Sequence, residues 1–244
     1  MRVSKLFNAK SVRHATGELL LIVAGILIAL AVSDWNDRKL QRQEEVLLLG
    51  EIQSALTVDL AALELNLQLW TETANQIKAL IEVLKSTPPY ESSFDQLFGA
   101  PYGFRPANLN TAAYESLKSA GLQVVSDPKL RLSIAKVLDQ HYESLTDVND
   151  IDTYVITDVL RPYYLKHFSN MVFLKSATPL DYEAVIQDKY FQNIIEYRLS
   201  VITANQVGFY TLAIEDIRAT LELIANDLAL VGQFETMSFP DPDN

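Results

Sequence analysis

The sequence predicts an all-α protein in which an N-terminal transmembrane helix continues into an antiparallel bundle of long helices. Fourteen apolar residues run without interruption from Leu19 to Val32. Gly and Pro are scarce, with 8 and 9 copies in 244 residues, and helix-forming residues dominate. Apolar residues then recur three or four positions apart between Leu49 and Leu84. That spacing is the period of an amphipathic helix.

Composition and charge exclude several kinds of function. The chain has no cysteine, so disulfides and thiolate metal sites are excluded. Its net charge is −11, and because the first fourteen residues carry four basic side chains and no acid, the remainder carries −15. An acidic body argues against binding to nucleic acid, whose phosphates need Lys and Arg for neutralisation.

The apolar run lies inside a predicted transmembrane helix at residues 15–35. A helix needs about 20 residues to cross the hydrocarbon core, and Trp35 suits the membrane interface. A cleavable signal peptide and a buried core helix are the alternatives. Glu18, at the head of the run, is unusual for a signal peptide, and a basic leader before an abrupt apolar block is unusual for a core helix. These features favour an uncleaved anchor.

The distribution of Lys and Arg favours a cytoplasmic N-terminus. The leader, residues 1–14, has four such residues, whereas three follow the apolar run. The more basic flank of a membrane helix usually stays inside the cell. We therefore expect a single-pass protein of a bacterial inner membrane, with a basic cytoplasmic leader and with the domain after the anchor in the periplasm.

Small residues in the anchor predict a surface for helix packing. Gly25, Ala29 and Ser33 recur every four residues, and Gly17 extends the same line. Such a stripe lets another backbone approach closely. Glu18 lies one position off the stripe, where it either sits among lipid head groups or hydrogen-bonds to a neighbouring helix. We therefore expect a homo-oligomer or a complex with another membrane protein.

Two segments resemble an uncharacterised family of bacterial single-pass membrane proteins. Residues 17–30, GELLLIVAGILIAL, with Asp34, Trp35 and Asn36 after them, are similar to the family's G-E-I-x-L-V-x-x-G-I-L-I-A-L and N-N-W-N pattern. Residues 111–121, TAAYESLKSAG, are similar to its T-x-Y-x-x-L-x-x-S-G segment. Departures occur at residues 33–34 and 120. The resemblance implies a membrane-anchored helical protein of unknown function, and it supplies no catalytic residues.

The first half of the predicted bundle, which covers residues 36–232 in all, is dominated by one helix. This helix is expected to continue from Ala15 through the anchor to Lys85, and the two prolines at 88–89 end it. A short helix is expected over 111–120 with Asn110 as its cap. An extended connector, residues 122–125, is expected to follow.

Two further long helices are expected in the second half. The first begins at Asp127 as N-cap, and Pro162 is expected to bend or break it. After a turn at Thr178-Pro179, the last helix is expected from about Asp181 to Val231. Residues 233–244 are expected to form a flexible tail.

Residues 87–109 form a predicted loop that is rich in aromatic side chains. A loop of this length is usually functional or specially packed. It either packs over the end of the bundle through its own aromatics, as Ω-loops do, or offers a ligand or partner surface. That surface would consist of Tyr90, Phe98, Tyr102, Phe104 and Arg105.

No pattern for catalysis or metal binding is found in the sequence. The three histidines lack the spacing of metal ligands. The acidic segment that begins at Asp147 has Ile151 and Asp152 where a calcium loop needs an oxygen ligand and a glycine. The segment is therefore interpreted as a solvated helix face. The motifs G-x-S-x-G, G-x-G-x-x-G and the P-loop are absent. We expect a protein that is not an enzyme and uses no cofactor.

The leading hypothesis is a membrane-anchored structural, scaffolding or assembly component that acts through protein–protein contacts, with the lipid bilayer as its first partner. The first alternative is an extracytoplasmic small-ligand sensor that signals through a separate membrane partner. An apolar cavity lined by Tyr154, Tyr163 or Phe168 would support it. The second alternative is a hydrolase whose site the sequence does not reveal, and it requires a pocket with converging polar groups.

Overall fold

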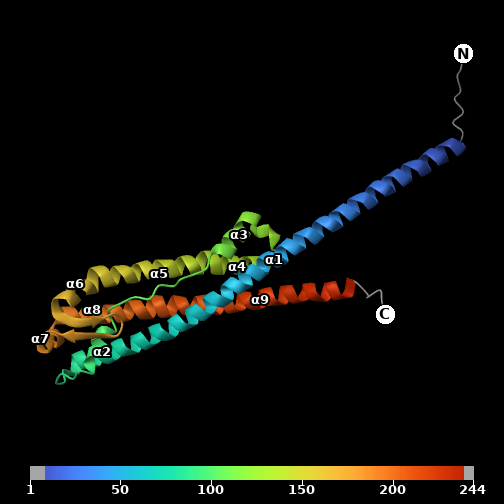
Figure 1. Cartoon of the computed structure of the whole chain (residues 1–244). Helices are drawn as coiled ribbons and strands as arrows, with labels where there is room; N and C mark the ends of the chain where they lie inside the picture. Colours follow the sequence, from blue (N-terminus) through green and yellow to red (C-terminus); the bar gives the residue numbers. More distant parts are fainter. Residues whose placement is uncertain (1–8, 239–244) are drawn as a thin grey trace, which may run out of the picture. The chain divides into compact units, whose positions relative to one another are not determined.

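The computed structural model describes the backbone of residues 9–238 and the side chains of residues 18–230. This part of the chain is helical almost throughout and contains one two-stranded sheet, so the all-α fold class is confirmed (Figure 1). The chain divides into two compact units, Met1–Leu47 and Leu48–Asn244.

The first unit consists, where it is described, of the beginning of helix α1, Ala9–Ser86. All its side chains from Glu18 to Gln41 are exposed, including the whole apolar run. In the part of the chain that is described, this is the one helix long and apolar enough to cross a membrane. A signal sequence near an N-terminus and the core helix of a soluble protein meet the same criteria of length and composition.

The second unit begins on the same helix, which is continuous as the sequence predicted. Its core-facing residues, among them Leu49, Ile52 and Leu56, are fully buried. The helix ends at Ser86, one residue before the two prolines, and the Ser86 hydroxyl donates a 2.6 Å hydrogen bond to the Glu82 carbonyl. The expected helix end at the proline pair is confirmed.

The segment after α1 contains more helix than the sequence predicted. Helix α2, Phe94–Gly99, lies inside the expected loop. Helix α3, Ala112–Ala120, is the expected short helix, and the Asn110 side chain accepts a 3.2 Å hydrogen bond from the Ala112 N–H. The expected extended connector is wrong: η1, Leu122–Val124, is a 3₁₀ turn that begins after Gly121, whose φ is +94°.

A second long helical run comprises α4 (Pro128–Ala135), η2 (Lys136–His141), α5 (Tyr142–Tyr154), η3 (Val155–Leu160) and α6 (Arg161–His167). Asp127 caps it by accepting a 2.7 Å hydrogen bond from the Lys129 N–H, as predicted. Of the expected bend or break at Pro162, the break does not occur, because the run continues to His167. Pro162 lies in the first turn of α6, directly after the π-helical η3. Proline is tolerated at such a position.

An antiparallel hairpin of β1 (Phe168–Val172) and β2 (Ser176–Pro179) follows, and it was not predicted. The register pairs Phe168 with Pro179 and Val172 with Ser176. The turn therefore lies at residues 173–175, where Leu174 has a φ of +58°. The expected turn at Thr178-Pro179 is wrong, because these residues belong to β2.

The expected last helix is divided into α7 (Tyr182–Gln187), α8 (Lys189–Val201), η4 (Ile202–Val207) and α9 (Gly208–Ser238). The chain is extended at Asp188, whose carboxylate accepts a 2.8 Å hydrogen bond from the Tyr190 N–H and caps α8. Aspartate favours this position over a helix interior. Helix α9 extends beyond the expected end near Val231, and residues 239–244 lie outside the described part.

Contacts between distant residues give the directions of the helices in the second unit. Asp59 of α1 meets Tyr142 of α5, and further along both helices Trp70 lies near Asp152. Helix α1 and the α4–α6 run therefore point the same way. Helix α9 runs in the opposite direction, as the colours in Figure 1 show, and the extended residues 101–111 connect α2 back to α3.

Candidate functional site

A buried polar cluster lies inside the second unit, beneath the segment that follows α2. Arg198 of α8 has no exposed surface, and Asp152 of α5 and Gln206 of η4 are almost completely buried. Both Arg198 and Gln206 donate hydrogen bonds to Asp152 Oδ1, the latter at 2.7 Å. Arg198 also donates to the backbone carbonyls of Pro101 at 3.2 Å and Gly103 at 2.9 Å. One guanidinium group thus joins three parts of the chain.

Two π-helical turns adjoin these side chains. Asp152 lies just before η3, and Gln206 lies within η4. Such turns often occur at functional sites.

Two guanidinium groups lie close to the ring of Trp70 on α1. The Cζ atoms of Arg105 and Arg198 lie 5.2 and 5.6 Å from its ring centroid, which is cation–π distance. Arg105 is half-buried and donates a 3.1 Å hydrogen bond to Thr73 Oγ1. Burial lowers the pKa of Arg105, and the positive charge of Arg198 adds to this shift, whereas the carboxylates of Glu72 and Asp152 oppose it. The pKa of Arg105 stays below its ordinary value, so these carboxylates do not fully offset the cost of burying the charge.

A pocket of about 550 Å³ lies over Arg105, and we name it the Arg105 pocket. Its volume falls in the usual range for small-molecule sites, roughly 300–1,000 Å³. Helices α1 and α2, the segment around Arg105 and the hairpin turn form its walls. The lining comprises Leu69, Glu72, Thr73, Gln76, Gln96, Arg105, Phe173, Leu174 and Lys175.

Close backbone packing fixes the hairpin turn at this pocket. A Cβ atom on Gly99 would lie 2.1 Å from the backbone nitrogen of Ser176. A Cβ on Gly103, whose φ is +149°, would lie 2.6 Å from Leu174 Cγ. The Leu174 N–H donates a 2.8 Å hydrogen bond to the Tyr102 carbonyl. Only glycine allows this approach at both positions.

The five loop residues that the sequence singled out have different positions. Phe98 and Tyr102 are buried among other aromatic rings, and Tyr102 stacks on Tyr164 with centroids 4.6 Å apart. Tyr90 and Phe104 are exposed, and Arg105 lines the Arg105 pocket.

The cavity expected for a sensor is not seen at the predicted residues. Tyr163 and Phe168 pack with Phe191, at centroid distances of 4.9 and 5.6 Å, and Tyr154 is exposed. None of the three lines the Arg105 pocket.

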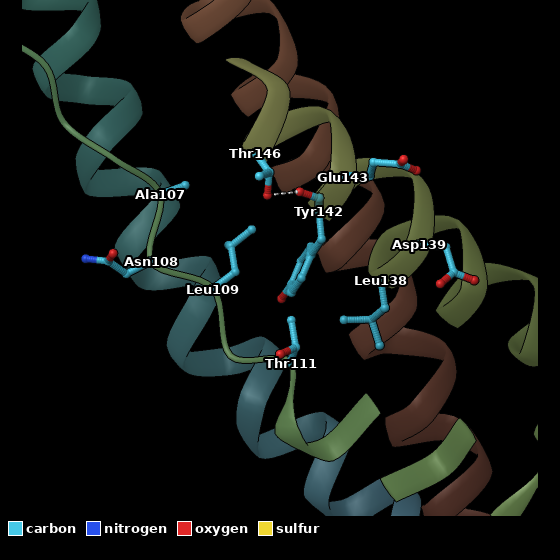
Figure 2. A pocket seen from close by; sticks show the side chains of 9 residues that line it. All are labelled: Ala107, Asn108, Leu109, Thr111, Leu138, Asp139, Tyr142, Glu143 and Thr146. Carbon is cyan, nitrogen blue, oxygen red and sulfur yellow. Dashed lines mark hydrogen bonds between the residues drawn. The ribbon is translucent and has the colours of Figure 1, made fainter. Parts of the chain in front are cut away.

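A second pocket, of about 570 Å³, lies between residues 107–111 and the helical run at α5 (Figure 2). Figure 2 shows the ring of Tyr142 pointing into it and the carboxylates of Asp139 and Glu143 at its edge. Tyr142 OH donates to Asp59 at 2.5 Å, and Tyr114 OH donates to Asp139 at 2.6 Å. Burial raises the pKa of both tyrosines, and these hydrogen bonds add to the shift. The Tyr142 hydroxyl and the Asp139 carboxylate of this pocket are thus already used in internal bonds.

The predicted packing residues of the anchor belong to the first unit. Glu18, Ala29 and Ser33 are exposed, and a Cβ on Gly25 would meet no atom within 4 Å. Gly17 precedes the residues whose surroundings the structure describes. The exposed ring of Trp35 has Lys39 Nζ 5.8 Å from its centroid.

His141 lies beside two charged side chains. Its Nε2 lies 2.5 Å from Asp216 Oδ2, and Lys136 Nζ lies 2.7 Å from the same oxygen. Burial alone would raise the pKa of Asp216, but these two partners lower it below its ordinary value. No group of three or more His, Cys, Asp or Glu side chains among the described residues is placed to hold a metal ion.

Comparison with known families identifies the chain at the family level. A profile described as "Family of unknown function (DUF6090)" matches residues 18–202, about three quarters of the chain. The chain belongs to the DUF6090 family. The expected membership of an uncharacterised family is thereby confirmed. No curated protein and no solved structure matches the chain.

The part of the chain that matches DUF6090 contains most of the structural features described above. It begins at Glu18 and includes the apolar run of α1, the Tyr114 segment, Arg105, Asp152 and Arg198. The sequence pattern assigned Asp152 to a solvated helix face and gave no role to Arg198. Each stands at a core position of its helix, since Arg198 continues the buried positions of Phe191 and Ile194. A charged residue at a core position of an amphipathic helix was the sequence signal that could have identified both residues.

Proposed function

We propose that this DUF6090 protein is a single-pass protein of a bacterial inner membrane whose helical domain has a structural, scaffolding or assembly role and catalyses no reaction. Helix α1 is the observation that carries the proposal. Its apolar run has no protein cover among the described residues, and the same helix then supplies buried residues to the core of the second unit. Burying a large aliphatic side chain is worth about 1.5–3 kcal/mol, and lipid would provide that burial.

The anchor is expected to leave the second unit in the periplasm. The basic residues before the apolar run outnumber those after it. In cells, an alkaline phosphatase fused to the C-terminus is expected to be active and to remain in the membrane fraction, whereas a β-galactosidase fusion is expected to be inactive. The reverse activities would place the domain in the cytoplasm. An active, shortened and soluble fusion would show that the segment is a cleaved signal peptide.

The small-residue stripe is expected to hold an oligomer. Gly25→Leu would add a large side chain where no atom of the same chain lies within 4 Å, so the fold of the single chain is expected to persist. If Gly25, Ala29 and Ser33 face another helix, the variant is expected to dissociate the complex, because close backbone approach is lost. Mass measurement after detergent extraction gives the copy number and any co-purifying protein.

The matched control for this variant is Leu27→Phe. Leu27 lies on the opposite side of the helix, at 100° per residue, and it is exposed. The enlarged side chain is expected to leave assembly unchanged. An intact complex in Gly25→Leu would show that lipid covers the stripe.

The Arg105 pocket favours a second function, that of an extracytoplasmic small-ligand sensor acting through a separate membrane partner. The pocket combines an incompletely compensated guanidinium group with amide, hydroxyl and apolar side chains. Such a combination orients a small ligand.

A further inference from the structure

We propose that the Arg105 pocket binds the carboxylate of a small organic acid that carries one negative charge and an apolar chain. All of its residues belong to the second unit, so the site is independent of how the chain is anchored. The inference deepens the sensor function and is tested by binding alone.

The charges around Trp70 do not balance. Two guanidinium groups face its ring, and one of them, Arg198, is bonded to the buried carboxylate of Asp152. Among the described side chains, Arg105 forms no salt bridge, and its side-chain hydrogen bond goes to the neutral hydroxyl of Thr73. With Lys175 and Glu72, which line the same pocket, these groups carry three positive and two negative charges, so one positive charge remains. A bound carboxylate would neutralise that charge in a half-buried site, where an ion pair is stronger than in water.

The Arg105 pocket contains hydrogen-bond donors that suit a carboxylate. A guanidinium group has five N–H donors in a planar fork that matches a carboxylate, and one of those of Arg105 is used by Thr73. Lys175 on the hairpin turn and the amides of Gln76 and Gln96 line the same pocket. Charge-assisted bonds from such groups are roughly twice as strong as neutral ones.

Other side chains of the pocket favour a ligand with one negative charge and an apolar chain. Glu72 also lines the pocket, and its carboxylate would repel a second negative charge, which disfavours phosphate and dicarboxylates. Phe173, which is 57% exposed, and Leu69 of α1 both line the pocket. An apolar chain packed against these side chains would remove apolar surface from water.

The structure provides a fluorescent reporter for the test. The chain has two tryptophans, so Trp35→Phe leaves Trp70 alone, with the guanidinium of Arg105 5.2 Å from its ring centroid. The full chain with this substitution, in lipid nanodiscs, is titrated with 3-phenylpropanoate, and equilibrium dialysis measures the dissociation constant directly. We expect saturable binding with a change in Trp70 emission. We expect no binding of the uncharged 3-phenylpropanamide and none of phosphate at the same concentrations.

Variants then locate the site. Arg105→Gln is expected to weaken binding at least about tenfold, since it removes a charge-assisted hydrogen bond. Lys175→Gln, at an exposed position on the hairpin turn, is expected to weaken it about threefold without affecting the fold. The control is Lys118→Gln, whose ammonium lies over Tyr114 far from the pocket and whose removal is expected to leave affinity unchanged.

Three results would overturn the proposal. These are the absence of saturable binding in dialysis, equal binding of the amide, and unchanged affinity in both Arg105→Gln and Lys175→Gln. Circular dichroism of each variant establishes that its helices are intact. If Arg105→Gln loses its helical signal, the affinity of Lys175→Gln decides whether the proposal holds.

Discussion

Replacement of Arg198 by leucine is expected to lower the free energy of unfolding by roughly 3–5 kcal/mol, because it leaves a buried carboxylate without its cation. Asp152 Oδ1 would keep only the 2.7 Å hydrogen bond from Gln206. The carbonyls of Pro101 and Gly103 would lose their donors as well. Urea denaturation of the solubilised full chain, followed by circular dichroism, measures the change.

The control is a second arginine–carboxylate pair between helices. Arg218 of α9 lies 2.6 Å from Glu64 of α1, and these side chains are 60% and 41% exposed. Because water screens an exposed pair, Arg218→Leu is expected to cost no more than about 1 kcal/mol. The double replacement of Arg198 and Asp152 by leucine is expected to be more stable than Arg198→Leu alone, since no unpaired charge remains. Equal losses for the two single arginine variants would contradict the assignment of Arg198 as the buried anchor of the cluster.

The sequence predicted the long helices well, because their signals are local and repeated. The spacing from Leu49 to Leu84 extends over many turns, and the proline pair marks its end. The hairpin was missed because strands β1 and β2 are short and their alternation is weak. The break at Asp188 was missed because one capping aspartate in a continuous apolar pattern resembles an ordinary surface residue.

The site was less accessible to prediction because its residues come together only in the folded chain. Trp70, Arg105, Asp152 and Arg198 belong to four different segments, and no short motif connects them. Arg105 was named as a surface candidate, whereas Asp152 was assigned to a solvated helix face. In the structure Ile151 is exposed and Asp152 is buried. The assignment of the whole acidic segment to a solvated face therefore concealed the partner of Arg198.

Gly99→Ala is expected to lower the free energy of unfolding by about 3 kcal/mol, near the upper end for an overpacked site. The added Cβ would lie 2.1 Å from the nitrogen and 2.3 Å from the Cα of Ser176. Both are backbone atoms, so no side-chain rotation can relieve the contact, and the hairpin must move away from α2. Urea denaturation measures the loss. Limited proteolysis at Lys175 is expected to become faster, because the turn is no longer held.

Gly50→Ala is the matched control, with an expected effect of opposite sign. Gly50 lies inside α1, and a Cβ there would meet no atom within 4 Å. Alanine in a helix interior is favoured over glycine by up to about 1 kcal/mol, so this variant is expected to be more stable than the parent. The same substitution thus tests two different constraints, since only Gly99 is fixed by the approach of the hairpin. If Gly99→Ala were neutral, the hairpin would not be held by this contact, and the wall of the Arg105 pocket would be free to move.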